Sequence, residues 1–512
     1  MQYPVEEFSP EERAALEPHF TNLDLPVFGL VNLPETVKGA LFARYSRYPG
    51  TLRRLFLDEF AQDMEAGVAN AYDGAEGERA RRLYENVFLG YGDDSVAQLG
   101  GAHIATEWVS NVLTKVLQRG RLTSYLEQST RYIPYDGPIP GGGGYRYWRD
   151  DSLGPEYAQT MDFLFETYSH ALAQVEQWAG ARWPRADGDA EGPWKRATRA
   201  KALDLLRGLL PASALSHVGI FASGQAYEQM LLRLLSSPLT EAREIGAMIL
   251  SELQKVMPSF VARVDRPDRG GEWMGYLAQR GEHAQTWARR LGLDRRDETD
   301  SGPSVRLLSV RGSEDDLLAA CLFEAASVSE AEARDAVRVL PPDERARLLA
   351  DLVGDRTNRR HRPGRGFEAV SYRFEIVSDY GAFRDLQRHR LLTVQWQTLG
   401  PDLGAGVPAE LEDAGVAGDY RAGLERSAAE YERIRDTVSP DLAPYALCLG
   451  YRIRYVLDMN AREAMHLIEL RSGREGHPGY RAVAHELHAQ IAEVHPTIAA
   501  AMTFVDRDTE PR

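Results

Sequence analysis

The chain has 512 residues, which is enough for two or three domains that each bury a substantial core. Hydrophobic residues make up 43% and charged residues 27%, the balance of a soluble globular protein rather than of a disordered or membrane protein. The net charge of −16 argues against a general nucleic-acid-binding surface, which has to be cationic. Two cysteines exclude a disulfide framework and a four-cysteine zinc site.

The start of the chain, MQYPVEEFSPEERAAL, is acidic and lacks the basic-then-apolar order of a secretory signal. No apolar run approaches the roughly 20 residues of a membrane span. We therefore expect a cytoplasmic protein without a membrane partner.

The distribution of apolar residues predicts an α/β (α+β) fold. Segments rich in Ala, Leu, Glu and Arg predict helices around 196–209, 226–256 and 410–437, and a β-branched and aromatic stretch predicts a strand at 369–377. A polar, turn-rich segment at 290–305 predicts a domain boundary, which gives domains 1–295 and 296–512.

The two halves of the chain resemble each other. The segment VLQRGRLTSYLEQST aligns with DLQRHRLLTVQWQTL and places Arg119 over Arg388. Further on, FASGQAYEQMLLRL aligns with LDMNAREAMHLIELR and places Ser223 over Asn460. Because both matches keep the same order in each half, they predict an internal duplication.

The first copy carries a family signature. Its segment RGRLTSYLEQSTRY resembles the RHRxxSxNxxSxRY motif of the flavin-dependent thymidylate synthases. The residues that match are Arg119, Arg121, Ser124, Ser129, Arg131 and Tyr132. Gly120 replaces the histidine of the motif and Leu126 replaces its asparagine.

The second copy has lost the opposite end of the same motif. RHRLLTVQWQTLG keeps Arg388, His389 and Arg390, but Gly400 and Pro401 stand in place of the final Arg-Tyr. The later helix motif of the family is kept here as Asn460, Arg462, His466, Leu470 and Arg471. The first copy has Ser223, Gln225, Gln229, Arg233 and Leu234 at those positions, although it keeps the Arg-x-x-Leu-Pro of the family at 207–211.

The resemblance implies two copies of the flavin-dependent thymidylate synthase fold, each a mainly antiparallel sheet flanked by helices. It implies an enzyme that converts dUMP to dTMP with methylenetetrahydrofolate, NADPH and bound FAD. Members of the family work as homotetramers with sites between subunits. The complementary losses then predict composite sites, built from a first copy and a second copy, in a homodimer that imitates the tetramer.

Each kept residue suits part of this chemistry. A nucleotide phosphate is recognised by guanidinium and hydroxyl donors, and a cation near the uracil stabilises charge that develops on the ring carbonyls. The candidates for dUMP binding are Glu127, Ser129, Arg131, Arg207 and Arg388. The candidates for FAD binding are Arg388, His389, Arg390, Asn460, Arg462 and His466, and the catalytic candidates are Arg471 and His389.

Several other interpretations remain open. The eroded motifs also fit a catalytically silent nucleotide- or flavin-binding homologue, or a flavin enzyme that acts on another pyrimidine. His485 and His488 lack the HExxH spacing of a zinc helix, so we expect no metal site there. The basic stretch Arg356 to Arg365 is predicted to be a surface loop, or a contact for a cofactor phosphate.

Overall fold

The chain divides into two compact units. The structure is a computed structural model that describes residues 3–33, 35–61, 98, 100–139, 144–188, 190–293 and 302–508. Unit 1 comprises residues 1–297 and 407–449, and unit 2 comprises residues 298–406 and 450–512. Much of the predicted boundary at 290–305 lies outside the described residues. Among the described helices, none is both long and apolar enough to cross a membrane.

Unit 1 contains a four-stranded antiparallel sheet. Its order is β1 (Val27–Gly29), β2 (Gly101–Ser110), β4 (Leu215–Ser223) and β3 (Thr123–Glu127). The helices that pack next to it include α6 (Asn111–Leu117), α9 (Gly224–Leu235) and α10 (Thr240–Val256). Ile104, Val218 and Ile245, from the sheet and from α10, are fully buried in one core cluster.

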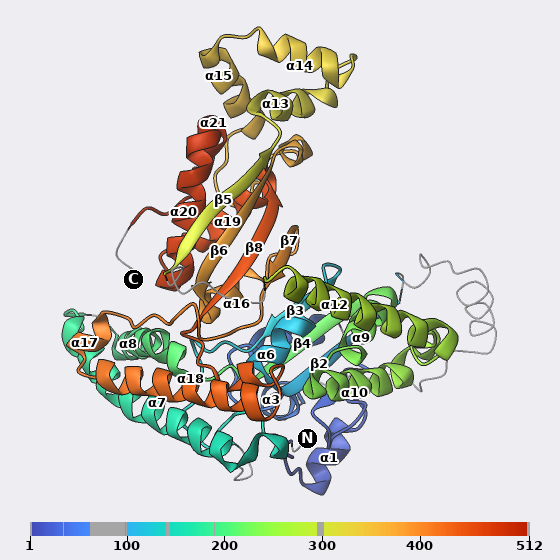
Figure 1. The fold of residues 1–512 in the computed structure, drawn as a ribbon, viewed down its shortest axis with the longest axis vertical. Coiled ribbons are helices and arrows are strands. Elements are labelled where there is room, and N and C mark those ends of the chain that lie inside the picture. The colour runs from blue at the N-terminus through green and yellow to red at the C-terminus, as the bar shows by residue number, and fades with distance from the viewer. Residues whose placement is uncertain are drawn as a thin grey trace. The chain divides into compact units, whose positions relative to one another are not determined.

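Unit 2 contains a second antiparallel sheet with the same connectivity. Its order is β5 (Ser304–Arg311), β6 (Ser371–Asp379), β8 (Arg452–Asn460) and β7 (Leu392–Trp396). Helices α19 (Ala461–Arg471) and α20 (Pro478–Val494) pack along it (Figure 1). Two sheets of the same order, each flanked by helices, confirm the predicted fold class and its duplication.

Equivalent helix caps fix the alignment of the two copies. Ser223 caps α9 at the end of β4, and Asn460 caps α19 at the end of β8. Gln118 ends α6, and Gln387 ends α16 (Tyr380–Leu386). The structure therefore agrees with both sequence alignments, one at a helix start and the other at a helix end.

The structure describes further helices in both units. In unit 1 they are α1 (Pro10–Leu16), α2 (Glu35–Tyr45), α3 (Leu52–Glu59), η3 (Asp151–Leu153), α7 (Gly154–Arg182), α8 (Glu191–Leu206), η4 (Arg207–Leu209), α11 (Pro258–Val261), η5 (Pro267–Gly271), α12 (Glu272–Arg290), α17 (Glu410–Asp413), α18 (Ala417–Thr437) and η7 (Ala443–Ala446). In unit 2 they are α13 (Glu314–Phe323), α14 (Glu330–Arg338), α15 (Pro342–Val353), η6 (Arg365–Ala369), α16 and α21 (Pro496–Ala500).

A segment from the second half of the sequence, 407–449, belongs to unit 1. Its helix α18 packs along α7. Backbone hydrogen bonds secure its end, because Ala212 N–H donates to the Leu447 carbonyl at 2.7 Å and Leu449 N–H donates to the Leu210 carbonyl at 2.8 Å. The compact units therefore do not follow the two halves of the sequence.

Two of the predicted long helices are broken. The helix expected over 226–256 is α9 followed by α10, with Pro238 in the break, because proline lacks the N–H that a continuous helix needs. The helix expected over 410–437 is α17 followed by α18. Gly415 between them has φ +73°, a left-handed conformation that ends helices.

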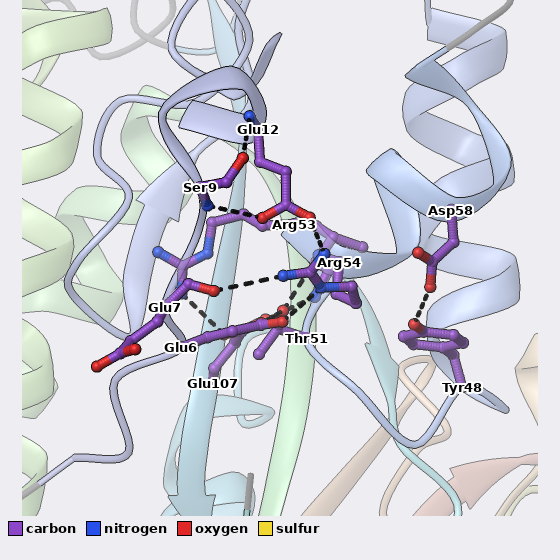
Figure 2. A network of polar contacts seen from close by, with 11 residues as sticks. Glu6, Glu7, Ser9, Glu12, Tyr48, Thr51, Arg53, Arg54, Asp58 and Glu107 are labelled. Atoms are coloured by element: carbon purple, nitrogen blue, oxygen red, sulfur yellow. Dashed lines mark hydrogen bonds and ion pairs between the residues drawn. The ribbon is translucent and has the colours of Figure 1, made fainter. Parts of the chain in front are cut away.

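A buried ion pair ties α3 to the first sheet. Arg53 Nη2 lies 3.2 Å from Glu107 Oε2, and the side chains are 4% and 0% exposed. Glu107, which Figure 2 shows beside Arg53, also accepts hydrogen bonds at Oε1 from Tyr45 Oη at 2.9 Å and Leu52 N–H at 2.7 Å. Glu107 sits in a β-bulge of β2, where Trp108 has φ +56°, and the paired part of β6 in the second copy has no such bulge.

A second buried carboxylate, Glu241, joins both parts of unit 1. It accepts hydrogen bonds from Ser110 N–H at 2.8 Å, Ser110 Oγ at 2.6 Å and Tyr445 Oη at 2.7 Å. Burial is the main cause that raises the pKa of Glu241 to about 7.

The free energy of unfolding should therefore fall as pH rises from about 4.5 to 7. The raised pKa means that the folded chain keeps a proton which the unfolded chain releases, so this stabilisation is full below pH 4.5 and lost above pH 7. Denaturation followed by tryptophan fluorescence reports on unit 1, because Trp396 is the one tryptophan of eight in unit 2. Glu241→Gln should flatten the pH profile by on the order of 1–3 kcal/mol. If the free energies of unfolding of the wild type and of Glu241→Gln changed with pH in the same way, this prediction would be wrong.

Candidate functional site

Three polar side chains of unit 2 form a linear hydrogen-bonded chain. Glu463 Oε1 lies 2.9 Å from His389 Nδ1, and Arg471 Nε donates to His389 Nε2 at 3.1 Å. His389 stands in the turn between α16 and β7, whereas Glu463 and Arg471 lie on α19. Their spacing on α19 is close to two helical turns, which turns both side chains toward the same histidine.

The position of the proton on His389 follows from its partners. A guanidinium only donates, so Nε2 is the acceptor and Nδ1 carries the hydrogen that is donated to Glu463. Burial, followed by the charge of Arg471, holds the pKa of His389 well below its usual range. The imidazole is therefore neutral, and it bridges a carboxylate and a guanidinium.

His466 completes this cluster. Its ring lies 5.4 Å from that of His389 in an edge-on arrangement. Burial is the largest cause that lowers the pKa of His466 to about 4, and neighbouring arginines add to the effect. Two neutral histidines thus lie among cations, which suits an anionic ligand. The guanidinium groups that lower the pKa of one or both histidines are those of Arg359, Arg362, Arg390 and Arg471.

The cluster contains the ligand types of a metal site, because atoms of His389, Glu463 and His466 all lie within 4.8 Å of one another. The hydrogen-bond pattern opposes this use. His389 Nδ1 carries a proton and its Nε2 lone pair points at Arg471, so neither nitrogen offers a lone pair to an ion. The surrounding arginines also repel a cation.

The other predicted FAD-binding residues lie in the same two parts of unit 2 as His389 and His466, namely α19 with its capping residue and the turn before β7. Asn460 caps α19, with its Oδ1 accepting from Glu463 N–H at 2.9 Å. Arg462 Nε donates to the Pro363 carbonyl at 2.8 Å. In the turn before β7, Arg390 Nη1 donates to the Arg388 carbonyl at 3.1 Å, and Arg388 Nη2 lies 3.3 Å from Asp385 Oδ1.

In unit 1, the predicted phosphate-binding residue Arg131 pairs with Asp204. Arg131 forms a bidentate pair with it, with Nε–Oδ1 at 2.6 Å and Nη2–Oδ2 at 2.7 Å. Ser129 Oγ accepts from Arg131 N–H at 3.2 Å. Arg207, which is 3% exposed, opens η4 three residues after Asp204. The Nε–Nη2 edge of Arg131 therefore already binds a carboxylate, which a phosphate at this edge would have to displace.

Glu127 is buried and paired within unit 1. Its Oε2 accepts from Lys115 Nζ at 3.0 Å and from Gln118 Nε2 at 2.9 Å. Its carboxylate therefore holds two neighbouring donors of unit 1.

The basic stretch at 356–365 is not simply a surface loop. Arg356 forms a buried ion pair with Glu469, with side chains 4% and 0% exposed. The prediction missed this because the acidic partner lies on α19, far along the chain. The histidines of HELH bond backbone carbonyls: His485 Nε2 lies 2.7 Å from Asp506 O, and His488 Nε2 lies 3.1 Å from Ala499 O.

The motif comparison also missed Glu463 and Asp204. Glu463 could have been noticed, since an acidic residue three positions after the capping Asn460 is a common helix-start pattern. Asp204 has no such signal, because its partner Arg131 lies 73 residues away.

The fold and these clusters define a duplicated α/β protein that holds one guanidinium–imidazole–carboxylate chain in its second copy. The chain belongs to the family described as thymidylate synthase complementing protein, whose model matches residues 53–259 and 312–497. The two matched segments confirm the predicted family and its tandem form.

Relatives of nearly the same length match almost the whole chain. A UPF0159 protein of Chlamydia muridarum is 37% identical over 98% of this chain and 96% of its own length. A UPF0159 protein of Thermoplasma acidophilum is 29% identical over 93% of this chain and 96% of its own. Among solved structures, a UMP/dUMP methylase from Streptomyces cacaoi bound with 5-Br dUMP is 22% identical, with a TM-score of 0.32, and the match covers 40% of this chain and 95% of that one.

Proposed function

We propose that the chain is a flavin-dependent thymidylate synthase that methylates dUMP reductively in the cytoplasm, with methylenetetrahydrofolate as carbon donor and NADPH as reductant. Membership of the family supports the reaction class. The observation that carries the proposal is the buried chain of Arg471, His389 and Glu463, which presents a cation beside two neutral rings.

The nucleotide would be held by residues of both copies. Ser129, Arg131 and Arg207 would bind the phosphate, with Glu127 orienting Lys115 and Gln118, and Arg388 would add a further guanidinium. Arg471 would stabilise the charge that develops on the uracil carbonyl when C5 acts as nucleophile. Because each copy keeps only part of this set, we propose composite sites in a homodimer.

FAD fits the second-copy cluster. The positive charge around His389 and His466 matches a pyrophosphate, and the neutral rings match the edge of a flat isoalloxazine. The residues that would hold it are Arg388, His389, Arg390, Asn460, Arg462 and His466. When bound, this cofactor supplies the hydride for the reduction.

Two measurements on the wild-type chain test the proposal. The purified protein should show flavin absorbance, or acquire it on titration with FAD, and should bind dUMP. The cloned chain should also let a thymidine-requiring host grow without thymidine. Flavin binding without growth would favour either a silent flavin-binding homologue or a flavin enzyme that acts on another pyrimidine.

A further inference from the structure

Glu463 has no place in the sequence motif, yet it is the buried end of the hydrogen-bonded chain. Glu463 and His389 are 4% and 7% exposed. The carboxylate accepts the Nδ1 hydrogen of His389, and the opposite ring nitrogen accepts from Arg471. Glu463 therefore selects the Nδ1-protonated tautomer of His389, which is the tautomer whose Nε2 can accept a hydrogen bond from Arg471.

The first copy has lost all three members of this chain together. The equivalent caps place Gly120 at the position of His389, and Ala226 and Leu234 at the positions of Glu463 and Arg471. A glutamate needed only at a helix start would have no reason to disappear with the other two. Its joint loss indicates that the three side chains work as one unit.

We propose that Glu463 is a positioning residue, which fixes the Nδ1-protonated tautomer of His389 and thereby aims the Arg471 guanidinium at the bound nucleotide. The part that concerns the nucleotide rests on the proposed function. Without the carboxylate, the Nδ1 hydrogen would have no anionic acceptor, and the proton could move to Nε2. Arg471 Nε and His389 Nε2 would then be two donors facing each other, and the guanidinium would turn away.

The first test reads the tautomer directly. In full-length protein with ¹⁵N-labelled histidine, the His389 signals are those that vanish in His389→Gly, a substitution that reproduces Gly120 of the first copy. We expect a protonated Nδ1 and an unprotonated Nε2 in the wild type, and a mixed or reversed tautomer in Glu463→Ala. An unchanged tautomer in that variant would overturn the proposal, whether or not the protein binds dUMP.

The second test measures dUMP affinity by calorimetry. Glu463→Ala should weaken binding on the order of tenfold in the wild-type background and less than about twofold in His389→Gly, because Glu463 acts through the histidine. Equal losses in both backgrounds would contradict this route. Glu486→Ala on the exposed part of α20 is the matched control and should leave the affinity unchanged. A wild-type chain that does not bind dUMP would count against the proposed function, while the tautomer result would still decide the role of Glu463.

Discussion

An Arg131→Ala chain and an Arg471→Ala chain should each lose thymidylate formation almost completely, by about a hundredfold or more. The reason is the division of residues between the copies: the Ser129–Arg131 segment is kept in the first, and the Arg471 cluster in the second. If every working site needs one of each, either substitution disables all sites. Two self-sufficient copies would instead leave roughly half of the activity in each variant.

The measurement is the initial rate of dTMP formation by purified, flavin-loaded protein. Arg435→Ala, at an exposed ion pair of α18, is the control and should keep the full rate. Circular dichroism should show that both variants remain folded. A variant with half the wild-type rate would refute the composite arrangement, even if the protein is a thymidylate synthase.

A mixed assembly then shows which chains contribute to one site. An Arg131→Ala chain and an Arg471→Ala chain, co-expressed with different tags and purified together, contain one intact first copy and one intact second copy on different chains. Activity of about half the wild-type value would place the two parts of a site on different chains. Continued inactivity would place them on the same chain.

The duplication could be predicted because short segments of the sequence are similar in the two copies. The residues that end β4 and β8 and begin α9 and α19 combine a cap with a helical pattern, and such a junction keeps its spacing in both copies. The shared strand order followed from it. The position of segment 407–449 could not be predicted, because its attachment to unit 1 depends on contacts with α7 and residues 210–212, hundreds of residues earlier.

The candidate site, too, could be predicted only in part from the sequence. His389, His466 and Arg471 could be selected by type and spacing, and the structure brings them together. The partners that set their behaviour, Glu463 for His389 and Asp204 for Arg131, required coordinates. An ion pair is determined by where two side chains meet, and a sequence motif fixes only one of them.

Glu107→Gln should lower the free energy of unfolding of unit 1 by about 3–5 kcal/mol, the largest stability effect that we expect from a single polar substitution. Arg53 Nε and Nη1 are buried and make no hydrogen bond to any residue that the structure describes, so Glu107 is the carboxylate that balances this guanidinium (Figure 2). A glutamine can still accept from Tyr45 and Leu52, but it leaves the charge of Arg53 buried and uncompensated.

Urea denaturation followed by tryptophan fluorescence measures this loss. Glu59→Gln is the matched control, because it breaks the exposed pair with Arg44 in the same part of unit 1 and should cost less than about 1 kcal/mol. If both substitutions lowered the free energy of unfolding equally, the buried ion pair of Arg53 would contribute no more to stability than the exposed pair of Arg44.

The double variant Arg53→Met, Glu107→Leu should recover most of the lost stability. Burial is the main cause that raises the pKa of Glu107 even though Arg53 lies beside it, so the desolvation of the carboxylate exceeds the attraction of the pair. An apolar pair of similar volume avoids that cost. A double variant less stable than Glu107→Gln would mean that the hydrogen bonds from Tyr45 and Leu52, rather than the charges, stabilise this part of the fold.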